Sequence, residues 1–387
     1  MNFFDSCFQS NEEMYSEDNY YHYSSPNYND MHINYIAQEK SYSDISKDQE
    51  FGLVGLRNNK NVCYMNAFLQ ILKNIHPLVN YFIYEYINNN TLEISNVFKY
   101  ILAKLLYKKT YTSAICLKTV MEKYDDYFKG IEFKDSLNFY ISLLSMMHKE
   151  LNVIKKEKKY ENYLSDNNED YFIKKKNEFF AKNNSIIIDT FYGFQKNIFF
   201  CENCKNKSEK FQAFNFLDFP IKKNELKIKN LENCFEIYQK QDKLQIECEN
   251  CKKGKLNVKY EIFSLPKILV IAFKKGDHIK HKVYFNEKLF MNRLIENKEE
   301  KNKQYNLIGF INHIENSNNS HNYCITKNIF NNKWYLFSDT TIYRVDQIQP
   351  FLHEAILLIY QLSGIEMPKN SLNKLKSIIQ IFNEKNK

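Results

Sequence analysis

The sequence predicts an α+β protein in which a mainly helical segment is followed by a largely antiparallel sheet. Between Phe51 and about Leu151, apolar residues recur at the spacing of amphipathic helices. After Ile186 the pattern changes to short runs of β-branched and aromatic residues. The chain has 387 residues, of which 44% are hydrophobic, and this is enough for a substantial core. Helices followed by strands are typical of the α+β class, and we expect a cleft between the two parts.

Residues 1–48 are rich in Tyr, Asn, Ser and Asp and show no sustained periodicity, which predicts a disordered tail. The first residues contain an acid and no apolar run, so we expect no secretory signal and a location inside the cell, in the cytoplasm, the nucleus or both. The longest apolar stretch, residues 262–273, is interrupted by polar residues and is too short to span a bilayer. No membrane segment is expected.

Residues 52–72 place Cys63 at the first turn of an amphipathic helix. The apolar residues that follow have the i, i+3, i+4, i+7 spacing of one helix face: Met65, Phe68, Leu69 and Leu72. At a helix N-terminus, free N–H groups and the helix dipole favour a thiolate. A buried structural cysteine is nevertheless the commoner fate of a single Cys. Other residues must therefore decide whether Cys63 is a nucleophile.

Two segments of the chain are predicted to lie outside the main core. Residues 153–184 combine lysine clusters with many asparagines and are interpreted as a charged insertion, either a solvated loop or a frayed helix. Residues 365–387 are expected to form an amphipathic or frayed C-terminal helix, to which we assign no function. The net charge of +8 comes from dispersed lysines rather than a basic block, so no nucleic-acid binding is expected.

The second half of the chain contains the predicted strands: 198–200, 211–216, 256–263, 268–273, 283–285, 305–311, 323–326, 334–337 and 355–360. Among them lie two matched pairs, Cys201-Glu-Asn-Cys204 and Cys248-Glu-Asn-Cys251. Two such pairs beside strands are typical of a four-thiolate ribbon, which predicts one structural zinc ion with no open position. A redox pair is the alternative, but the thioredoxin-like βαβ context is missing. The other cysteines without a partner pattern are expected to be inert: Cys7, Cys116, Cys234 and Cys324.

The order of the cysteine segment, the two Cys pairs and a distant histidine segment resembles the ubiquitin-specific protease family of cysteine deubiquitinases, from about Phe51 to Gln361. The segments that carry the resemblance are residues 52–72, 135–139, 191–193, 265–275, 305–313, 320–323 and 334–339. The sequence departs from the family pattern at several positions. Lys60 and Val62 replace the usual Gly and Thr, and Leu137 and Asn138 replace Gln and Glu.

The resemblance implies a papain-like cysteine protease fold with a helical thumb, a palm formed by an antiparallel sheet, and zinc-ribbon fingers. The catalytic domain would cover residues 49–364, including the insertion at 153–184 and the fingers at about 195–262. The implied activity is that of a thiol-dependent deubiquitinase. It would hydrolyse the isopeptide or peptide bond after the C-terminal glycine of ubiquitin, with Cys63 as the nucleophile. The expected partners are ubiquitin and ubiquitinated proteins, and we expect a monomer.

The catalytic histidine of the family is usually part of a Gly-His-Tyr sequence. Alignment on Tyr323 without a gap would place Asn322 at the catalytic position, whereas alignment on His313 places His321 there. We predict His321, with a one-residue bulge after it, because an asparagine cannot take up the proton that Cys63 must lose. A histidine near a loop end without a catalytic role is the alternative.

Further roles follow from the resemblance. Asp339 is expected to orient the imidazole, and Ser338, beside it, to assist. Asn58, five residues before the nucleophile, resembles the oxyanion residue of the family. Asp135 resembles the acid that binds an arginine near the end of ubiquitin, and Tyr323 is expected to wall the groove for the paired glycines of the tail.

Two other functions stay open at this point. The first is a catalytically weak pseudoprotease that binds ubiquitin or a ubiquitin-like modifier without efficient cleavage, because the residues around His321 and Ser338 are changed. The second is a zinc-ribbon module for protein or nucleic-acid interaction without catalysis. The sequence does not determine linkage preference or the protein target.

Overall fold

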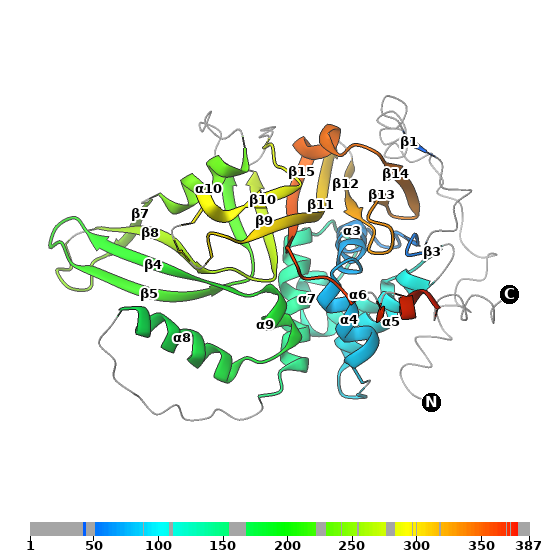
Figure 1. Cartoon of the computed structure of the whole chain (residues 1–387), viewed down its shortest axis with the longest axis horizontal. Coiled ribbons are helices and arrows are strands. Elements are labelled where there is room, and N and C mark those ends of the chain that lie inside the picture. The colour runs from blue at the N-terminus through cyan, green and yellow to red at the C-terminus, as the bar shows by residue number, and fades with distance from the viewer. Residues whose placement is uncertain are drawn as a thin grey trace.

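The fold consists of a helical lobe, a large central sheet and a smaller projecting sheet (Figure 1). The computed structural model describes residues 42–43 and 51–377, with gaps at 88, 108–110, 155–167, 222–229, 241, 254, 276–282, 296, 299, 317–318, 369 and 372. Helices dominate before about residue 191 and strands dominate after it. The α+β arrangement predicted from the sequence is therefore confirmed.

The helical lobe is built from amphipathic segments that bury their apolar faces against one another. Its elements are α3 (Cys63–Leu72), α4 (His76–Asn80), the π-helical turn η2 (Tyr81–Glu85), α5 (Glu93–Tyr107), α6 (Ile115–Tyr124), the short 3₁₀ turn η3 (Asp126–Phe128), α7 (Ser136–Leu151) and α9 (Ile186–Phe191). Every residue of α3 is buried. It runs through the middle of the core, between α7 and the central sheet, which fixes its N-terminus firmly in place.

The central sheet has nine strands, whose main path runs β1-β14-β13-β12-β11-β15-β9-β6. Only the β6–β9 pair is parallel, and β10 pairs with β11 off the main path. The bounds are β1 (Tyr42–Ser43), β6 (Leu217–Ile221), β9 (Ile268–Lys275), β10 (Lys288–Phe290), β11 (Gln304–Asn316), β12 (Asn319–Lys327), β13 (Trp334–Ser338), β14 (Thr341–Val345) and β15 (Ala355–Leu362).

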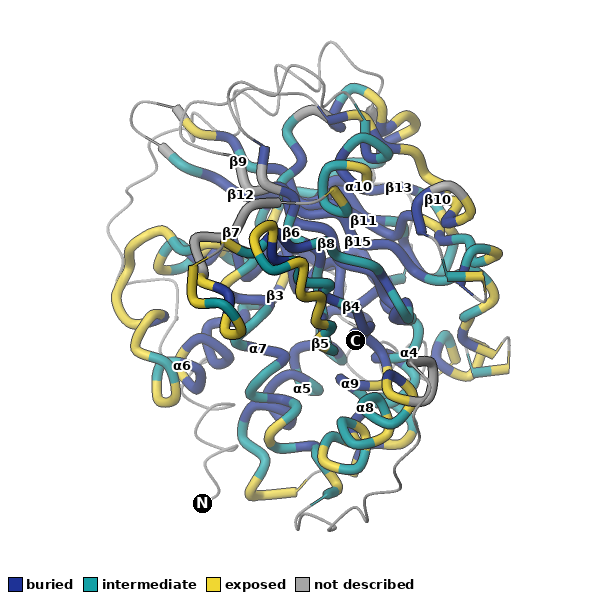
Figure 2. The backbone as a smooth tube through the Cα atoms, turned by 90° about the vertical axis from the view of Figure 1, so that its left-hand side faces the viewer, coloured by how far each residue is buried: buried dark blue, intermediate teal, exposed yellow. Residues whose placement is uncertain are grey.

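Each face of the central sheet has its own apolar core, and the interior strands are buried (Figure 2). Cys324 and Phe337 face the helical lobe, whereas their neighbours Tyr323 and Leu336 face the opposite core. This alternation is the ordinary pleat of a strand. Helix α10 (Leu231–Gln239), which the sequence analysis missed, supplies residues to the opposite core; Asn230 caps it by accepting a hydrogen bond from the Asn233 N–H.

The projecting sheet has the order β5-β4-β8-β7, with β4 (Gly193–Cys201), β5 (Lys207–Phe214), β7 (Asp242–Glu247) and β8 (Lys255–Ser264). Helix α8 (Asn168–Lys182) lies along this sheet (Figure 1). Its Phe172 is only 1% exposed and packs 5.4 Å from the Phe263 ring. This part of the charged insertion is therefore a packed helix rather than a solvated loop, because its aromatic residues bury against the sheet.

The two ends of the chain are partly described. Of the predicted N-terminal tail, only Tyr42–Ser43 lie within the described residues, and they pair with β14. Near the C-terminus, the Met367 N–H donates to His76 Nδ1 at 2.9 Å, and the Tyr84 hydroxyl donates to the Ser371 carbonyl at 2.6 Å. This segment therefore packs on α4 and η2. No helix in the described part of the chain is both long and apolar enough to cross a membrane.

Candidate active site

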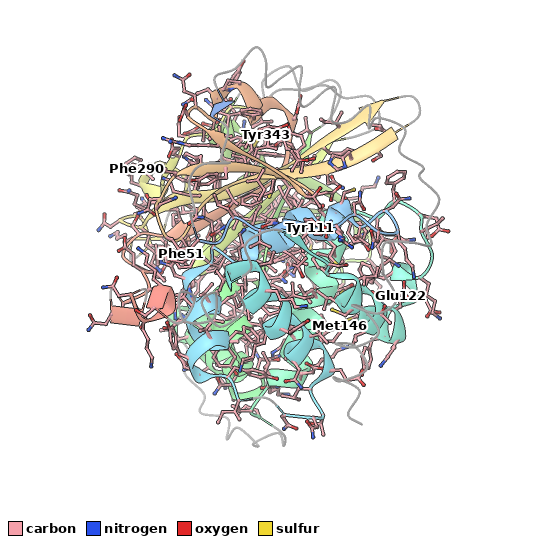
Figure 3. The ribbon with its side chains drawn as sticks, turned by 90° about the vertical axis from the view of Figure 1, so that its right-hand side faces the viewer. Phe51, Tyr111, Glu122, Met146, Phe290 and Tyr343 are labelled. Atoms are coloured by element: carbon pink, nitrogen blue, oxygen red, sulfur yellow. The ribbon has the colours of Figure 1, made fainter. Side chains whose placement is uncertain are left out.

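Cys63 begins α3 at the junction of the helical lobe and the central sheet. Figure 3 views this junction from one side, with Tyr343 of β14 above, Met146 of α7 below, and Tyr111 between them. The loop before Cys63 is held by two side-chain amides. Asn58 Oδ1 accepts a hydrogen bond from the Val62 N–H at 2.7 Å, and Asn61 Nδ2 donates to the Ile131 carbonyl at 2.8 Å.

The same loop contains two consecutive residues in the left-handed region. Lys60 has a φ of 68° and Asn61 a φ of 54°. Asparagine tolerates this conformation, whereas lysine adopts it at a cost of about 1–2 kcal/mol. Lys60 is the position at which the resemblance would place a glycine. The loop keeps its shape in spite of this departure because the Asn58 and Asn61 hydrogen bonds hold it.

The Cys63 thiol is buried and neutral. Burial raises its pKa to about 11; the Asp339 carboxylate adds to the rise, and the Asn322 backbone N–H, which donates to Sγ, opposes it. Cys63 is only 1% exposed. The expectation that the helix N-terminus alone favours a thiolate is therefore not met, because removal of the sulfur from water outweighs the hydrogen bonds that it accepts.

The bulge predicted after His321 is wrong. Strands β11 and β12 pair without interruption from Gly309–Thr326 to Asn316–Asn319, and β12 pairs regularly with β13. In a regular strand, alternate side chains point to opposite faces. Since Cys324 faces α3 and Tyr323 faces away, Asn322 lies on the face toward α3 and His321 on the opposite face.

His321 makes its side-chain hydrogen bond to Ser338. Its Nε2 lies 2.9 Å from Ser338 Oγ, and its Nδ1 lies 4.0 Å from Asp339 Oδ2. Burial, together with nearby His313, lowers the pKa of His321 to about 4, so the ring is neutral at pH 7. Within the described chain, no hydrogen bond joins His321 to Cys63. The structure therefore brings Ser338 and Asp339 close to His321 but does not place the imidazole on the sulfur.

Asp339, which was predicted to orient the imidazole, faces α3. Its Oδ1 accepts a hydrogen bond from Asn66 Nδ2 at 2.8 Å, although 273 positions separate the two residues. The tight turn between β13 and β14 places it there, with a φ of 51° at Asp339 and its carbonyl accepting from the Leu56 N–H at 2.8 Å. A Cβ at Gly55 would lie 2.6 Å from the Thr340 backbone, so only glycine lets this turn approach so closely.

Sequence reasoning missed Asn66 as a site residue. It lies one helical turn after Cys63 and is the residue that ties α3 to the Asp339 turn. A sequence cue was present, because an asparagine near the start of an otherwise apolar and buried helix needs a hydrogen-bond partner. The partner itself could not be identified without the tertiary structure.

The two predicted substrate contacts differ in their surroundings. Asp135 is exposed and caps α7, where its Oδ1 accepts from the Asn138 N–H at 2.9 Å. Tyr323 is only 1% exposed, and its hydroxyl donates to Glu354 and accepts from Asn312 Nδ2. Tyr323 therefore belongs to the core opposite α3 and does not line an open groove, contrary to the prediction.

The four paired cysteines converge at one end of the projecting sheet. Their sulfur atoms all lie within 4.8 Å of one another: Cys201, Cys204, Cys248 and Cys251. Sulfurs of different pairs are 3.7 Å apart, close to the ~3.8 Å that zinc–sulfur bonds of about 2.3 Å give in a tetrahedron. The two loops match, with a left-handed lysine after each pair, Lys205 and Lys252. This cluster could hold a metal ion.

Two further amides approach the sulfurs. Asn203 Nδ2 donates to Cys251 Sγ at 3.5 Å, and Asn250 Nδ2 donates to Cys204 Sγ at 3.7 Å. Each asparagine belongs to one pair and reaches a sulfur of the other. Such outer hydrogen bonds orient metal ligands and stabilise the charge of thiolates.

The chain matches a known family over most of its length. The family of ubiquitin carboxyl-terminal hydrolases covers residues 54–360. The chain is 26% identical over 338 residues to ubiquitin carboxyl-terminal hydrolase 2 of Bos taurus and of Homo sapiens. These alignments cover 81% of this chain and 55% and 56% of the two relatives, so the chain spans about half their length. Putative ubiquitin carboxyl-terminal hydrolase 11 of Arabidopsis thaliana is 30% identical over 199 residues, or 49% of this chain and 22% of that protein.

Solved structures share the fold. A SAGA DUB module of Ubp8, Sgf11, Sus1 and Sgf73 bound to monoubiquitin gives a TM-score of 0.62 at 19% identity, covering 87% of this chain and 74% of that one. A yeast SAGA module gives 0.63 at 19% identity, covering 87% and 75%. The helical lobe, central sheet and projecting sheet thus correspond to the predicted thumb, palm and fingers. The chain belongs to the ubiquitin carboxyl-terminal hydrolase family.

Proposed function

We propose that this chain is a thiol-dependent deubiquitinase that cleaves the isopeptide or peptide bond after the C-terminal glycine of ubiquitin. The observation that carries the proposal is the position of Cys63. It lies at the N-terminus of a helix, with the Asn322 N–H on its sulfur and Asp339 nearby, in a chain that matches the family across residues 54–360. Attack of the sulfur on the glycine carbonyl would form a thioester, which water then hydrolyses.

Asn58 is suited to stabilise the oxyanion of this reaction. Its Oδ1 accepts from the Val62 N–H, so its Nδ2 remains as the donor for an oxyanion, and Asn58 is exposed. A donor of this kind is typically worth about 3 kcal/mol in the transition state. Asn66 and Asp339 hold the β13–β14 turn against α3 and so fix the wall of the site.

Labelling with ubiquitin that carries a cysteine-reactive C-terminus tests the proposal. We expect one ubiquitin per chain to attach, and Cys63→Ala to abolish the attachment. Cys116→Ala is the matched control, since Cys116 is also a buried cysteine in the first turn of a helix, α6, and lies outside the site. Undiminished labelling in Cys63→Ala, or complete inertness of the folded wild-type protein toward ubiquitin, would refute the proposal.

Asp135 and Asn138 lie at the place where the tail of ubiquitin is proposed to bind. Asp135 has one carboxylate oxygen engaged in the α7 cap, and Asn138 stands exposed beside it. We expect Asn138→Glu to bind ubiquitin about two- to fivefold more tightly, because an exposed charge pair is worth about 0.5–1 kcal/mol. Titration of ubiquitin in the Cys63→Ala background measures this, with Asn138→Gln as a control of similar length without charge. Equal affinity of the Glu and Gln variants would contradict the expectation.

The metal at the four cysteines is, we propose, one zinc ion in a structural role. Four thiolates leave no open position for substrate or water, and the spacing of the sulfurs fits zinc. Zinc would fix the two loops to each other and so keep the end of the fingers folded. Ubiquitin is proposed as the partner that the fingers, palm and thumb together bind.

A further inference from the structure

Asn322 lies against the nucleophile. Its backbone N–H donates to Cys63 Sγ, and its side chain lies on the face of β12 that packs on α3. The residue is only 6% exposed, and its Oδ1 is buried without a hydrogen-bond partner among the described residues. Buried oxygen atoms are nearly always paired, so this orphaned amide beside the sulfur requires an explanation.

An amide at this position cannot perform acid–base chemistry. Asparagine offers two N–H donors and one carbonyl acceptor, but it does not gain or lose a proton in the pH range in which proteins are folded. The ionisable side chains near the sulfur do not replace it. Asp339 accepts from Asn66, and its negative charge disfavours the thiolate, while Tyr64 follows on α3. His313, which pairs with Asn322 across β11 and β12 and so lies on the same face, has its Nε2 bonded to Ser320 at 2.8 Å. His321, on the far face of β12, is bonded to Ser338.

We propose that Asn322 occupies the place from which a side-chain base would have to serve Cys63, so that hydrolysis of ubiquitin conjugates is slow and limited by ionisation of the thiol. The inference rests on the proposed deubiquitinase function and specifies how that site works. A ubiquitin conjugate would therefore stay uncleaved at this site for longer than in an enzyme whose imidazole activates the thiol.

The steps balance with water as the only co-reactant. Hydroxide or a buffer base removes the Cys63 proton, and the thiolate forms a carbon–sulfur bond to the terminal glycine carbonyl. The carbon–nitrogen bond of the isopeptide breaks, and the lysine amine takes a proton from water. A second water then cleaves the thioester and restores the thiol.

The pH dependence of cleavage distinguishes this mechanism from one with a base. We expect kcat/KM of the wild-type protein on a ubiquitin C-terminal amide to rise about tenfold per pH unit between about pH 6.5 and 8.5, without a plateau. Asn322→His should raise the rate at neutral pH by about a hundredfold or more and introduce a plateau above the pKa of the new imidazole. The thermal midpoint of this variant, measured beside the wild type, shows whether it is folded.

His321→Gln is the second variant and does not depend on whether Asn322→His folds. We expect its kcat at pH 7.5 to stay within about threefold of the wild type, because His321 lies on the face of β12 opposite α3 and its Nε2 is bonded to Ser338. A loss of about a hundredfold in kcat at unchanged KM, or a wild-type plateau that disappears in this variant, would overturn the inference. Those results would leave the proposed function intact, which fails only if cleavage and labelling do not depend on Cys63.

Discussion

We expect removal of the metal to unfold the end of the fingers while the palm and thumb stay folded. The four sulfurs within 4.8 Å of one another join the β4–β5 loop to the β7–β8 loop. Without an ion, four closely spaced thiols gain little from this arrangement, whereas binding of structural zinc contributes about 10–16 kcal/mol in isolated zinc-finger peptides. The effect should therefore be large but local, because the palm and thumb have cores of their own.

Cys204→Ser is the variant to measure. We expect it to lose bound zinc, from one ion per chain to a small fraction, as determined by elemental analysis of the purified protein. Hydrogen exchange should become fast at the ends of β4, β5, β7 and β8 that adjoin the cysteines and stay slow in β11 and β12. Cys234→Ser is the control, because Cys234 lies between the two pairs in sequence but is buried in α10, away from the sulfur cluster. Unchanged exchange in Cys204→Ser, or a wild-type protein purified without metal, would contradict the zinc proposal.

The second large effect concerns acid stability, and it arises from His321. His321 is only 5% exposed. Burial, together with the nearby His313, lowers the pKa of its imidazole to about 4. The pKa of an unfolded histidine is about 6.5. Between these values the unfolded chain binds more protons than the folded chain, so the free energy of unfolding falls as the pH falls. Between pH 7 and pH 5 the loss due to this residue is about 2 kcal/mol.

Urea unfolding at both pH values measures this loss. We expect His321→Gln to lose about 2 kcal/mol less than the wild type on going from pH 7 to pH 5. His148→Gln is the matched control: burial also lowers the pKa of His148, but its ring is only half-buried and is bonded to Asn183, so the difference should be smaller. Equal pH dependence in the wild type and His321→Gln would show that the ring is already accessible to protons in the folded protein.

The features that the sequence predicted correctly are those written in local patterns. Helix α3 follows from apolar residues at helical spacing, and most of the predicted strands fall within β4, β5, β8, β9, β11, β12, β13 and β15. Residues 283–285 contain only an isolated bridge at Tyr284. Helix α10 was not predicted, because its short apolar run lies in the half of the chain for which strands were expected. Helix α8 was judged by its charges, and the aromatic residues that dock it on the fingers became evident only with their partners.

The candidate site separates into two parts in the same way. The cysteine pairs lie close in sequence within each loop, so their convergence into one cluster that could hold a metal was predictable, and Cys63 was placed by the helix that it begins. The protonation of Cys63 was not predictable, since it depends on how much protein covers the sulfur. Nor was the hydrogen bond between Asn66 and Asp339, which joins residues 273 positions apart.

The sequence by itself determined the fold class, the four cysteines suited to a metal and the position of Cys63. Only the tertiary structure decided whether His321 or Asn322 faces that cysteine. The physical reason is the pleat of β12: a shift of one residue exchanges the two faces of a strand, so a bulge would have brought His321 to the sulfur, whereas the regular pairing of β11 with β12 brings Asn322 there instead.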